Sequence, residues 1–335
     1  MKETTLKRAE IFVQNKDTLE KVFSLRDNLE NLAGAAVLLS RNEPVEEQTI
    51  RDCRKILRDQ TSIFSSFRDY VEPAAVAELA LSDNPEDKMA RSMAAFKALW
   101  QRFGDSSHLP IAAITMANHA QPYQYEELAQ KAREIYVQER KKHPFLTSSE
   151  DSAFCTLIAI MGRPAEDVIL ETENCYQLLK KNFLDGNAVQ ALALILALSP
   201  EPAEEKCRRT MELFQLMKDK KHKYGTSYEL ASLGAVSMSA TDYDSLSDEI
   251  IEVYEWLGRQ KGFGFWSMLS DKQKLMYAAL IIMQDHSQEN GQDEAGQTAA
   301  ISGIVSLVIA QEIALYAAIS ASAFQIRNNE ANKTD

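Results

Sequence analysis

The chain has 335 residues, of which 45% are hydrophobic and 26% are charged, the composition of an ordinary globular protein with ample material for a core. The formal net charge of −12 disfavours nucleic acid as a partner, because affinity for nucleic acid depends largely on Lys and Arg side chains that neutralise phosphates. Only 12 glycines and 9 prolines interrupt the chain, which favours helices over a turn-rich β fold.

The N-terminal segment is charged and has no apolar stretch of the kind found in a secretory signal, so we expect a cytoplasmic protein. Residues 1–30 are predicted to form capping helices. The cysteines, Cys53, Cys155, Cys175 and Cys207, include no Cys-x-x-Cys pair. We interpret them as small buried hydrophobic residues rather than as members of a disulfide or a metal site.

An internal repeat organises the next part of the chain. Five aromatic residues recur about forty positions apart in similar sequence contexts: Phe96, Tyr136, Tyr176, Phe214 and Tyr254. A repeat of this length with two helices falls near the range of HEAT-like repeats. Because one helix pair cannot bury its apolar face alone, neighbouring pairs must stack. We therefore expect each aromatic ring to be a core residue that touches the next repeat; the alternative is a row of rings that stacks on a ligand.

One repeat shows the pattern in full. Residues 187–198 are almost wholly apolar and predict a buried helix, which we name the A helix of the pair. Pro200 and Pro202 end it and start the second, B helix, whose apolar residues follow i, i+4, i+7 spacing on one face. We expect Gly225 to supply the left-handed residue that stops the B helix.

The same plan recurs over residues 31–283 and predicts about six or seven helix pairs. In one repeat, Thr241 and Asp242 replace the linker prolines and are expected to cap the B helix. The predicted fold is all-α, with tandem antiparallel helix pairs of about forty residues that form a HEAT-like α-solenoid or an α/α superhelix.

Residues 284–335 are predicted to close the array with a polar loop, over 284–296, and an apolar helix, over 299–324. The apolar run is long enough to cross a bilayer. Glu312 lies at its centre, where an acidic residue costs ~3 kcal/mol on insertion scales. We favour a buried helix and keep a membrane anchor as the alternative. A lone buried carboxylate is costly, so Glu312 needs a partner and is a candidate binding residue.

No motif identifies a reaction. The sequence has no Walker A loop, no dinucleotide-binding glycine motif, no zinc-protease helix and no nucleophile elbow, so we predict no catalytic residues and no cofactor. None of the five histidines pairs with another His or Cys at metal-ligand spacing, so we predict no metal site.

Polar residues gather near the starts of the predicted A helices and are the candidate binding residues of the repeats. They are His108, Asp151, Asn187, Gln190, Tyr228 and Glu229. In a closed ring of helix pairs these residues would converge on a central pocket, whereas in an open stack they would be exposed ends. Basic clusters end several B helices, and stacking would align them into one basic edge opposite an acidic one.

Three segments, 63–71, 78–92 and 106–117, read IFSSFRDYV, ELALSDNPEDKMARS and SSHLPIAAITMA. They resemble an uncharacterised bacterial family, domain of unknown function four-thousand-and-three. The resemblance extends over most of the chain, from about residue 23 to the apolar C-terminal run. It implies a bacterial cytoplasmic protein and transfers no catalytic residue.

These patterns favour a non-catalytic scaffold for a protein or peptide partner, because repeat stacks offer long concave surfaces. One alternative is an enzyme or small-molecule binder with a polar pocket at the A-helix ends. The other is a membrane-associated protein that uses residues 299–324.

Overall fold

The structure is a computed structural model that describes residues 1–24, 28–104, 106, 108–142, 151–160, 162, 164–199, 201–227, 229–264, 267 and 269–290. Within these residues it has fourteen α-helices and no strand, which confirms the predicted all-α class for this part of the chain. Three short 3-10 turns, η1 (Leu38–Ser40), η2 (Ser66–Arg68) and η3 (Pro122–Gln124), lie between the helices.

The helices alternate between a buried A type and an amphipathic B type after the N-terminal helix α1 (Glu3–Val22). The A helices are α2 (Asn28–Val37), α4 (Glu72–Ala80), α6 (Leu109–His119), α8 (Asp151–Ile160), α10 (Gly186–Ala197), α12 (Glu229–Ser237) and α14 (Asp271–Asn290). The B helices are α3 (Glu47–Gln60), α5 (Pro85–Phe103), α7 (Tyr125–Lys142), α9 (Ala165–Leu179), α11 (Ala203–Asp219) and α13 (Tyr243–Gly258). All nine residues of α12 are buried, as the apolar A pattern predicts.

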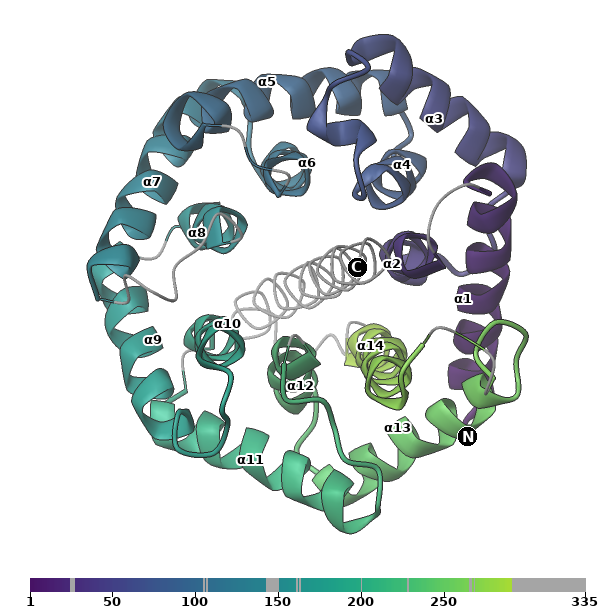
Figure 1. The fold of residues 1–335 in the computed structure, drawn as a ribbon, viewed down its shortest axis with the longest axis vertical. Coiled ribbons are helices and arrows are strands. Elements are labelled where there is room, and N and C mark those ends of the chain that lie inside the picture. Colours follow the sequence, from purple (N-terminus) through teal and green to yellow (C-terminus); the bar gives the residue numbers. More distant parts are fainter. Residues whose placement is uncertain are drawn as a thin grey trace, which may run out of the picture. The chain divides into compact units, whose positions relative to one another are not determined.

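The chain divides into two compact units. The early unit is Gln14–Ile169, and the late unit combines Met1–Val13 with the described chain from Leu170 onward. In the early unit α2, α4, α6 and α8 pack in succession as one layer, and α3, α5 and α7 as a second (Figure 1). In the late unit α10, α12 and α14 form one layer and α11 and α13 the other. Sequential helix pairs are therefore the packing scheme of each unit.

Local backbone and side-chain features explain where α13 begins and where α11 ends. The Asp242 side chain accepts a hydrogen bond from the Ser245 N–H at 3.2 Å, which confirms the predicted cap of α13. The prediction that Gly225 stops α11 is wrong. The helix ends at Asp219, and Lys221 adopts the left-handed conformation with φ of 64°. Gly225 instead makes room for Glu229, since a Cβ at residue 225 would lie 2.3 Å from the Glu229 carboxyl.

The aromatic row packs between repeats, but its ring partners come from the preceding repeat and not from the next one. Four of its five rings meet a ring that ends or follows the preceding B helix, nearly edge-on. The centroid distances are 5.3 Å for Phe67–Phe96, 5.5 Å for Phe103–Tyr136, 5.2 Å for Phe183–Phe214 and 5.3 Å for His222–Tyr254. Edge-on pairs of this kind stabilise a core beyond the area that they bury. The row is thus a structural feature of the stacking.

A charged residue stands five positions before each of the five aromatics: Arg91, Lys131, Glu171, Arg209 and Glu249. Two arginines at this position reach the end of the next A helix. Arg91 donates to the carbonyl of Ala117, in the last turn of α6, and to that of Ala120, just after the helix, at 3.1 Å. Arg209 donates to the carbonyl of Ala240, after α12, at 3.3 Å. The carbonyls at the end of a helix have no partner within it, so these cations stabilise the turn to the next B helix.

Two glutamates at the same position pair with a basic side chain of the next repeat. Glu171 Oε1 lies 2.5 Å from Nζ of Lys206, which is 1% exposed. Glu249 Oε2 lies 2.6 Å from Nε2 of His286 in α14. The recurring charge therefore connects one repeat to the next in all four of these cases.

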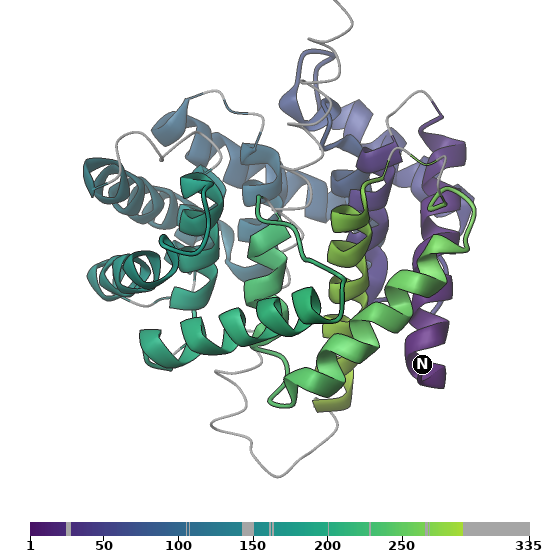
Figure 2. The same ribbon diagram turned by 60° about the horizontal axis from the view of Figure 1, so that its bottom comes forward.

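The N-terminal residues pack on the last described helix of the late unit (Figure 2). The Asp285 carboxylate in α14 accepts hydrogen bonds from Thr5 Oγ1 at 2.5 Å and from Arg8 Nε at 3.5 Å. These contacts and the His286–Glu249 pair support helix beyond residue 283. The predicted start of a polar loop at residue 284 is therefore wrong, because α14 continues to Asn290. The rest of that loop and residues 299–324 lie outside the described residues.

Candidate functional site

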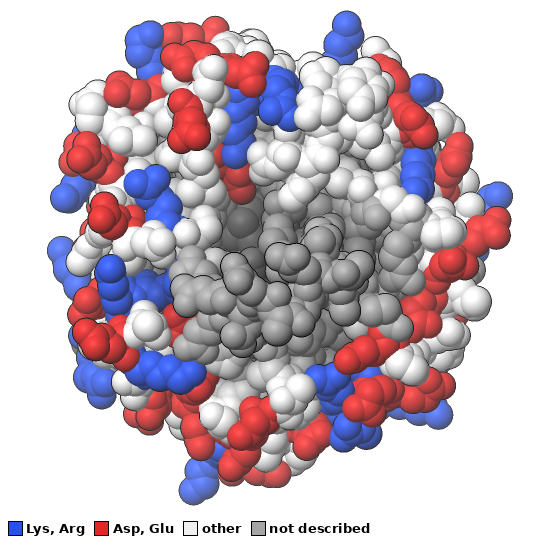
Figure 3. All heavy atoms as spheres, turned by 180° about the vertical axis from the view of Figure 1, so that it is seen from behind, with Lys and Arg blue, Asp and Glu red and all other residues white. Residues whose placement is uncertain are grey.

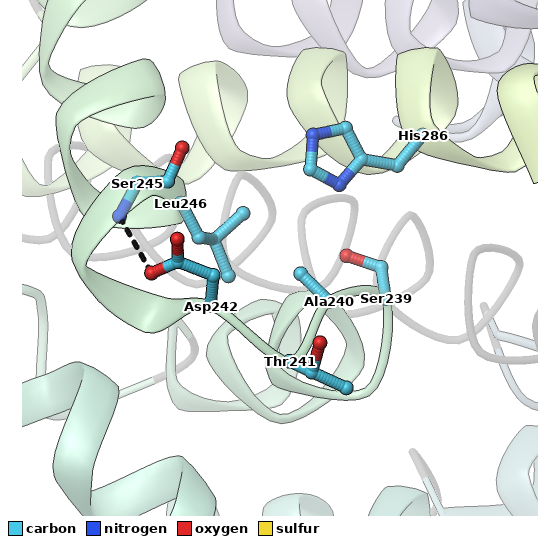
Figure 4. A pocket seen from close by; sticks show the side chains of 7 residues that line it. All are labelled: Ser239, Ala240, Thr241, Asp242, Ser245, Leu246 and His286. Carbon is cyan, nitrogen blue, oxygen red and sulfur yellow. Dashed lines mark hydrogen bonds between the residues drawn. The ribbon is translucent and has the colours of Figure 1, made fainter.

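A pocket of about 350 Å³ opens in the late unit, where the turn between α12 and α13 faces α14 (Figure 4). It is lined by Ser239, Ala240, Thr241, Asp242, Ser245, Leu246 and His286. Its volume is at the lower end of the ~300–1,000 Å³ typical of ligand sites. Polar side chains from three different elements line it, which makes it a candidate binding site within the described residues.

The turn between α12 and α13 is fixed by Arg209 and Tyr243. Arg209 holds the Ala240 carbonyl, and its Nε donates to the Tyr243 hydroxyl at 2.5 Å. The Tyr243 hydroxyl donates in turn to the carbonyl of Ser237 at 3.0 Å. Burial raises the pKa of Tyr243 although Arg209 favours the phenolate, so the hydroxyl keeps the proton that it donates. The turn that lines the pocket is therefore held in place by these hydrogen bonds from Arg209 and Tyr243.

His286 brings an imidazole ring over the turn formed by Ser239 and Ala240 (Figure 4). Its Nε2 is bound by Glu249 from α13, and the two side chains are 15% and 20% exposed. The other oxygen of Glu249 lies 3.4 Å from Nζ of Lys2. The ring is thus oriented by a carboxylate, and its second nitrogen, Nδ1, is the one left for the pocket.

Two further side chains bring oxygen atoms to the pocket. The Ser239 hydroxyl donates to the Val236 carbonyl at 2.7 Å. The exposed Asp242 uses its Oδ1 as the cap of α13. A carboxylate–histidine pair beside a serine is also the arrangement of nucleophilic catalysis. Here the serine proton goes to a backbone carbonyl and not to His286, so the geometry supports binding.

Residues 15–313 match a protein-family model described as "Protein of unknown function (DUF4003)". The chain belongs to the DUF4003 family. The resemblance found in the sequence is thereby confirmed. No curated protein and no solved structure matches this DUF4003 chain.

The described A-helix starts of the late unit lie together, but they are not an open site. The Ser227 hydroxyl donates to Asp185 Oδ2 at 2.9 Å and so connects the start of α12 with that of α10. Of the predicted residues there, Gln190 is buried at 2% exposure and Glu229 at 7%, while Asn187 is exposed. The cluster is part of the packing between α10 and α12.

Of the four other predicted candidates, the structure describes only the side chain of His108. His108 lies in the early unit, buried, with Nδ1 at 2.9 Å from the Tyr70 hydroxyl. Asp151 begins α8, but its side chain is outside the described residues. Tyr228 and Glu312 also lie outside them. The structure thus brings together only the α10 and α12 members of the predicted set.

Sequence reasoning missed the pocket of this DUF4003 chain because its residues lie at the opposite, C-terminal ends of the A helices. In the sequence His286 has no His or Cys at metal-ligand spacing, and Glu249 resembles a solvent-exposed residue of an amphipathic helix. One sequence feature could have identified Glu249: a charged residue stands five positions before each of the five aromatic residues, and at this position Glu249 lies beside the next A helix.

Two further properties concern metal and membrane binding. Among the side chains that the structure describes, no three or more of His, Cys, Asp and Glu gather closely enough to hold a metal ion. No described helix has the length and apolar character needed to cross a membrane. The four cysteines are buried, which confirms their interpretation as core residues.

Proposed function

We propose that this DUF4003 protein is a non-catalytic scaffold for a protein or peptide partner. In the same proposal, its helix pairs continue one after another as an α-solenoid or α/α superhelix. The sequential packing of each unit supports that fold, and so do the charged residues that connect successive repeats. Four buried cysteines without a Cys-x-x-Cys pair suit a reducing cytoplasm, the compartment that we propose.

The observation that carries the proposed function is a row of uncovered leucines in the late unit. Leu170 and Leu178 lie two helical turns apart on α9 and are 59% and 42% exposed. Leu184, in the turn before α10, is fully exposed. Large apolar side chains that stay in water along one stretch of chain are candidate contacts for a partner. Because the row runs along a helix, it suits the apolar face of an amphipathic partner helix.

Charge is less suited to select the partner. On the face drawn in Figure 3, acidic and basic side chains are interspersed, and neither sign gathers in one block. That face gives no support to separate basic and acidic edges. The leucines are therefore the feature on which we base the interaction.

The test compares two variants that each place one carboxylate on the exposed face of α9. Leu178→Asp removes a leucine from the row, whereas Asn174→Asp changes an exposed polar residue one turn earlier. The full chain and both variants are used for affinity capture from native lysate, and each captured protein is then purified and titrated by calorimetry. We expect binding by the full chain and by Asn174→Asp, and a loss of at least about tenfold in Leu178→Asp. Equal binding by the two variants would contradict the proposal.

The alternatives have less support in the described residues. The A-helix starts of α10 and α12 are mostly buried against each other, which disfavours an open pocket there. Membrane association rests on residues 299–324, outside the described residues. The pocket beside His286 supports a separate binding activity.

A further inference from the structure

We propose that the pocket beside His286 binds a primary ammonium group. This inference goes beyond the scaffold function, because it concerns a different surface of the late unit. It rests on the direction of each hydrogen bond around the pocket and on the charge of the surrounding groups.

The Glu249–His286 pair fixes which ring nitrogen carries the proton. An ionised carboxylate only accepts hydrogen bonds, so His286 Nε2, at 2.6 Å from Glu249, must donate. In the neutral form of His286, on which the proposal rests, one ring nitrogen donates and the other accepts, so Nδ1 is the acceptor. Within the described residues Nδ1 has no hydrogen-bond partner of its own, so its lone pair is available to the pocket.

The oxygen atoms of the pocket are acceptors as well. Ser239 has committed its only hydroxyl proton to the Val236 carbonyl, which leaves lone pairs on Oγ. Asp242 uses Oδ1 for the Ser245 N–H, and its Oδ2 has no partner among the described side chains. These three acceptor side chains, two from the turn between α12 and α13 and one from α14, line one pocket, and a ligand must supply the donors. An ammonium group has three donors and no acceptor.

The charge around the cavity favours a cation. Ser239 and Ala240 follow directly after α12, and the C-terminal end of a helix carries partial negative charge. Asp242 adds a full negative charge at the rim. Neither Lys2, on the far oxygen of Glu249, nor Arg209, behind the turn, is a lining residue. An anion would meet lone pairs and a carboxylate, so anionic ligands are disfavoured.

The remaining walls suit an alkyl stem. Leu246 and Ala240 supply apolar surface beside the three acceptors (Figure 4). A volume of about 350 Å³ accommodates a small alkylamine or one lysine side chain. The shared chemistry is a primary ammonium on an alkyl chain, and the two sources are a free amine and a lysine of a peptide.

The test uses the full chain labelled with ¹⁵N-histidine, and follows the His286 ring nitrogens by NMR. The probes are n-butylammonium chloride with its neutral counterpart n-butanol, and the peptide acetyl-Gly-Lys-Gly-amide with its Nε-acetylated form. We expect saturable shifts at His286 Nδ1 with an ammonium probe and none with its neutral counterpart. Shifts with butylammonium indicate a free amine as the ligand, and shifts with the lysine peptide indicate a peptide.

Two matched variants separate recognition from folding. Asp242→Asn removes one charge but keeps a good N-cap for α13. Asp244→Asn removes the same charge from the neighbouring exposed residue, which pairs with Lys220 and does not line the pocket. We expect about tenfold weaker ammonium binding in Asp242→Asn and an unchanged affinity in Asp244→Asn. The proposal is overturned if n-butanol binds as well as n-butylammonium, if no ammonium probe shifts His286, or if both variants weaken binding equally.

Discussion

The ring pair Phe183–Phe214 gives the sharpest test of how the repeats stack. Both rings are buried, at 7% and 8% exposure, and they meet edge-on with centroids 5.2 Å apart. Truncation of a buried Phe to Ala costs ~3–5 kcal/mol, of which the aromatic pair itself supplies ~0.5–1.5 kcal/mol. The free energy of unfolding should therefore fall by several kcal/mol in Phe214→Ala.

A double-mutant cycle with Phe183→Leu and Phe214→Leu isolates the pair term, because leucine retains most of the volume. Urea unfolding followed by circular dichroism gives the four free energies. We expect a coupling energy of ~1 kcal/mol. Phe64→Leu is the control, since that ring is 91% exposed and its replacement should change stability by less than ~0.5 kcal/mol. A coupling below ~0.3 kcal/mol would refute inter-repeat packing by the aromatic row.

Three other predictions follow from the packing. Gly34→Ala should destabilise the chain by ~1–3 kcal/mol in thermal unfolding, because a Cβ would lie 3.0 Å from the Pro73 carbonyl oxygen. By contrast, Gly258→Ala should raise the free energy of unfolding by up to ~1 kcal/mol, since a Cβ there meets nothing within 4 Å. If Gly34→Ala were more stable than Gly258→Ala, the close approach of α2 and α4 would be contradicted. Arg209 donates to the Tyr243 hydroxyl and to the Ala240 carbonyl, and a lysine can keep only one of these two bonds, so Arg209→Lys should lower the free energy of unfolding by ~1–3 kcal/mol. Hydrogen exchange at residues 239–242 should rise. Unchanged exchange would show that the arginine does not stabilise the turn. Burial raises the pKa of Cys53 to about 11, so Cys53 should resist alkylation in the native chain near neutral pH and react only in denaturant.

Helix positions could be predicted from the sequence because burial imposes a period on them. The apolar A segments and the amphipathic B segments differ in composition, and each aromatic stands at the same place in its B helix. Phe214 could therefore be assigned to the core before its partner was known. The identity of that partner, Phe183, could not be predicted, because it depends on how two helices cross.

The candidate site was harder to predict than the fold. A charged residue on an amphipathic helix is usually solvated, so Glu249 and Arg209 carried no signal by themselves. Their roles depend on the next repeat, which brings His286 and Ala240 within reach. The extension of α14 likewise depends on Thr5, about 280 positions away in sequence, which bonds to Asp285. Such long-range contacts override a polar sequence that on its own predicts a loop.

We propose above that this DUF4003 protein binds a partner through the exposed leucines of α9 and of the turn after it. Site-specific photocrosslinking in cells tests it most directly, with benzoylphenylalanine placed at Leu178 and, as a control, at Glu212, which is exposed on α11. We predict a discrete adduct with a second polypeptide from position 178 and none from position 212. No adduct at position 178, or the same adducts from both positions, would contradict the claim.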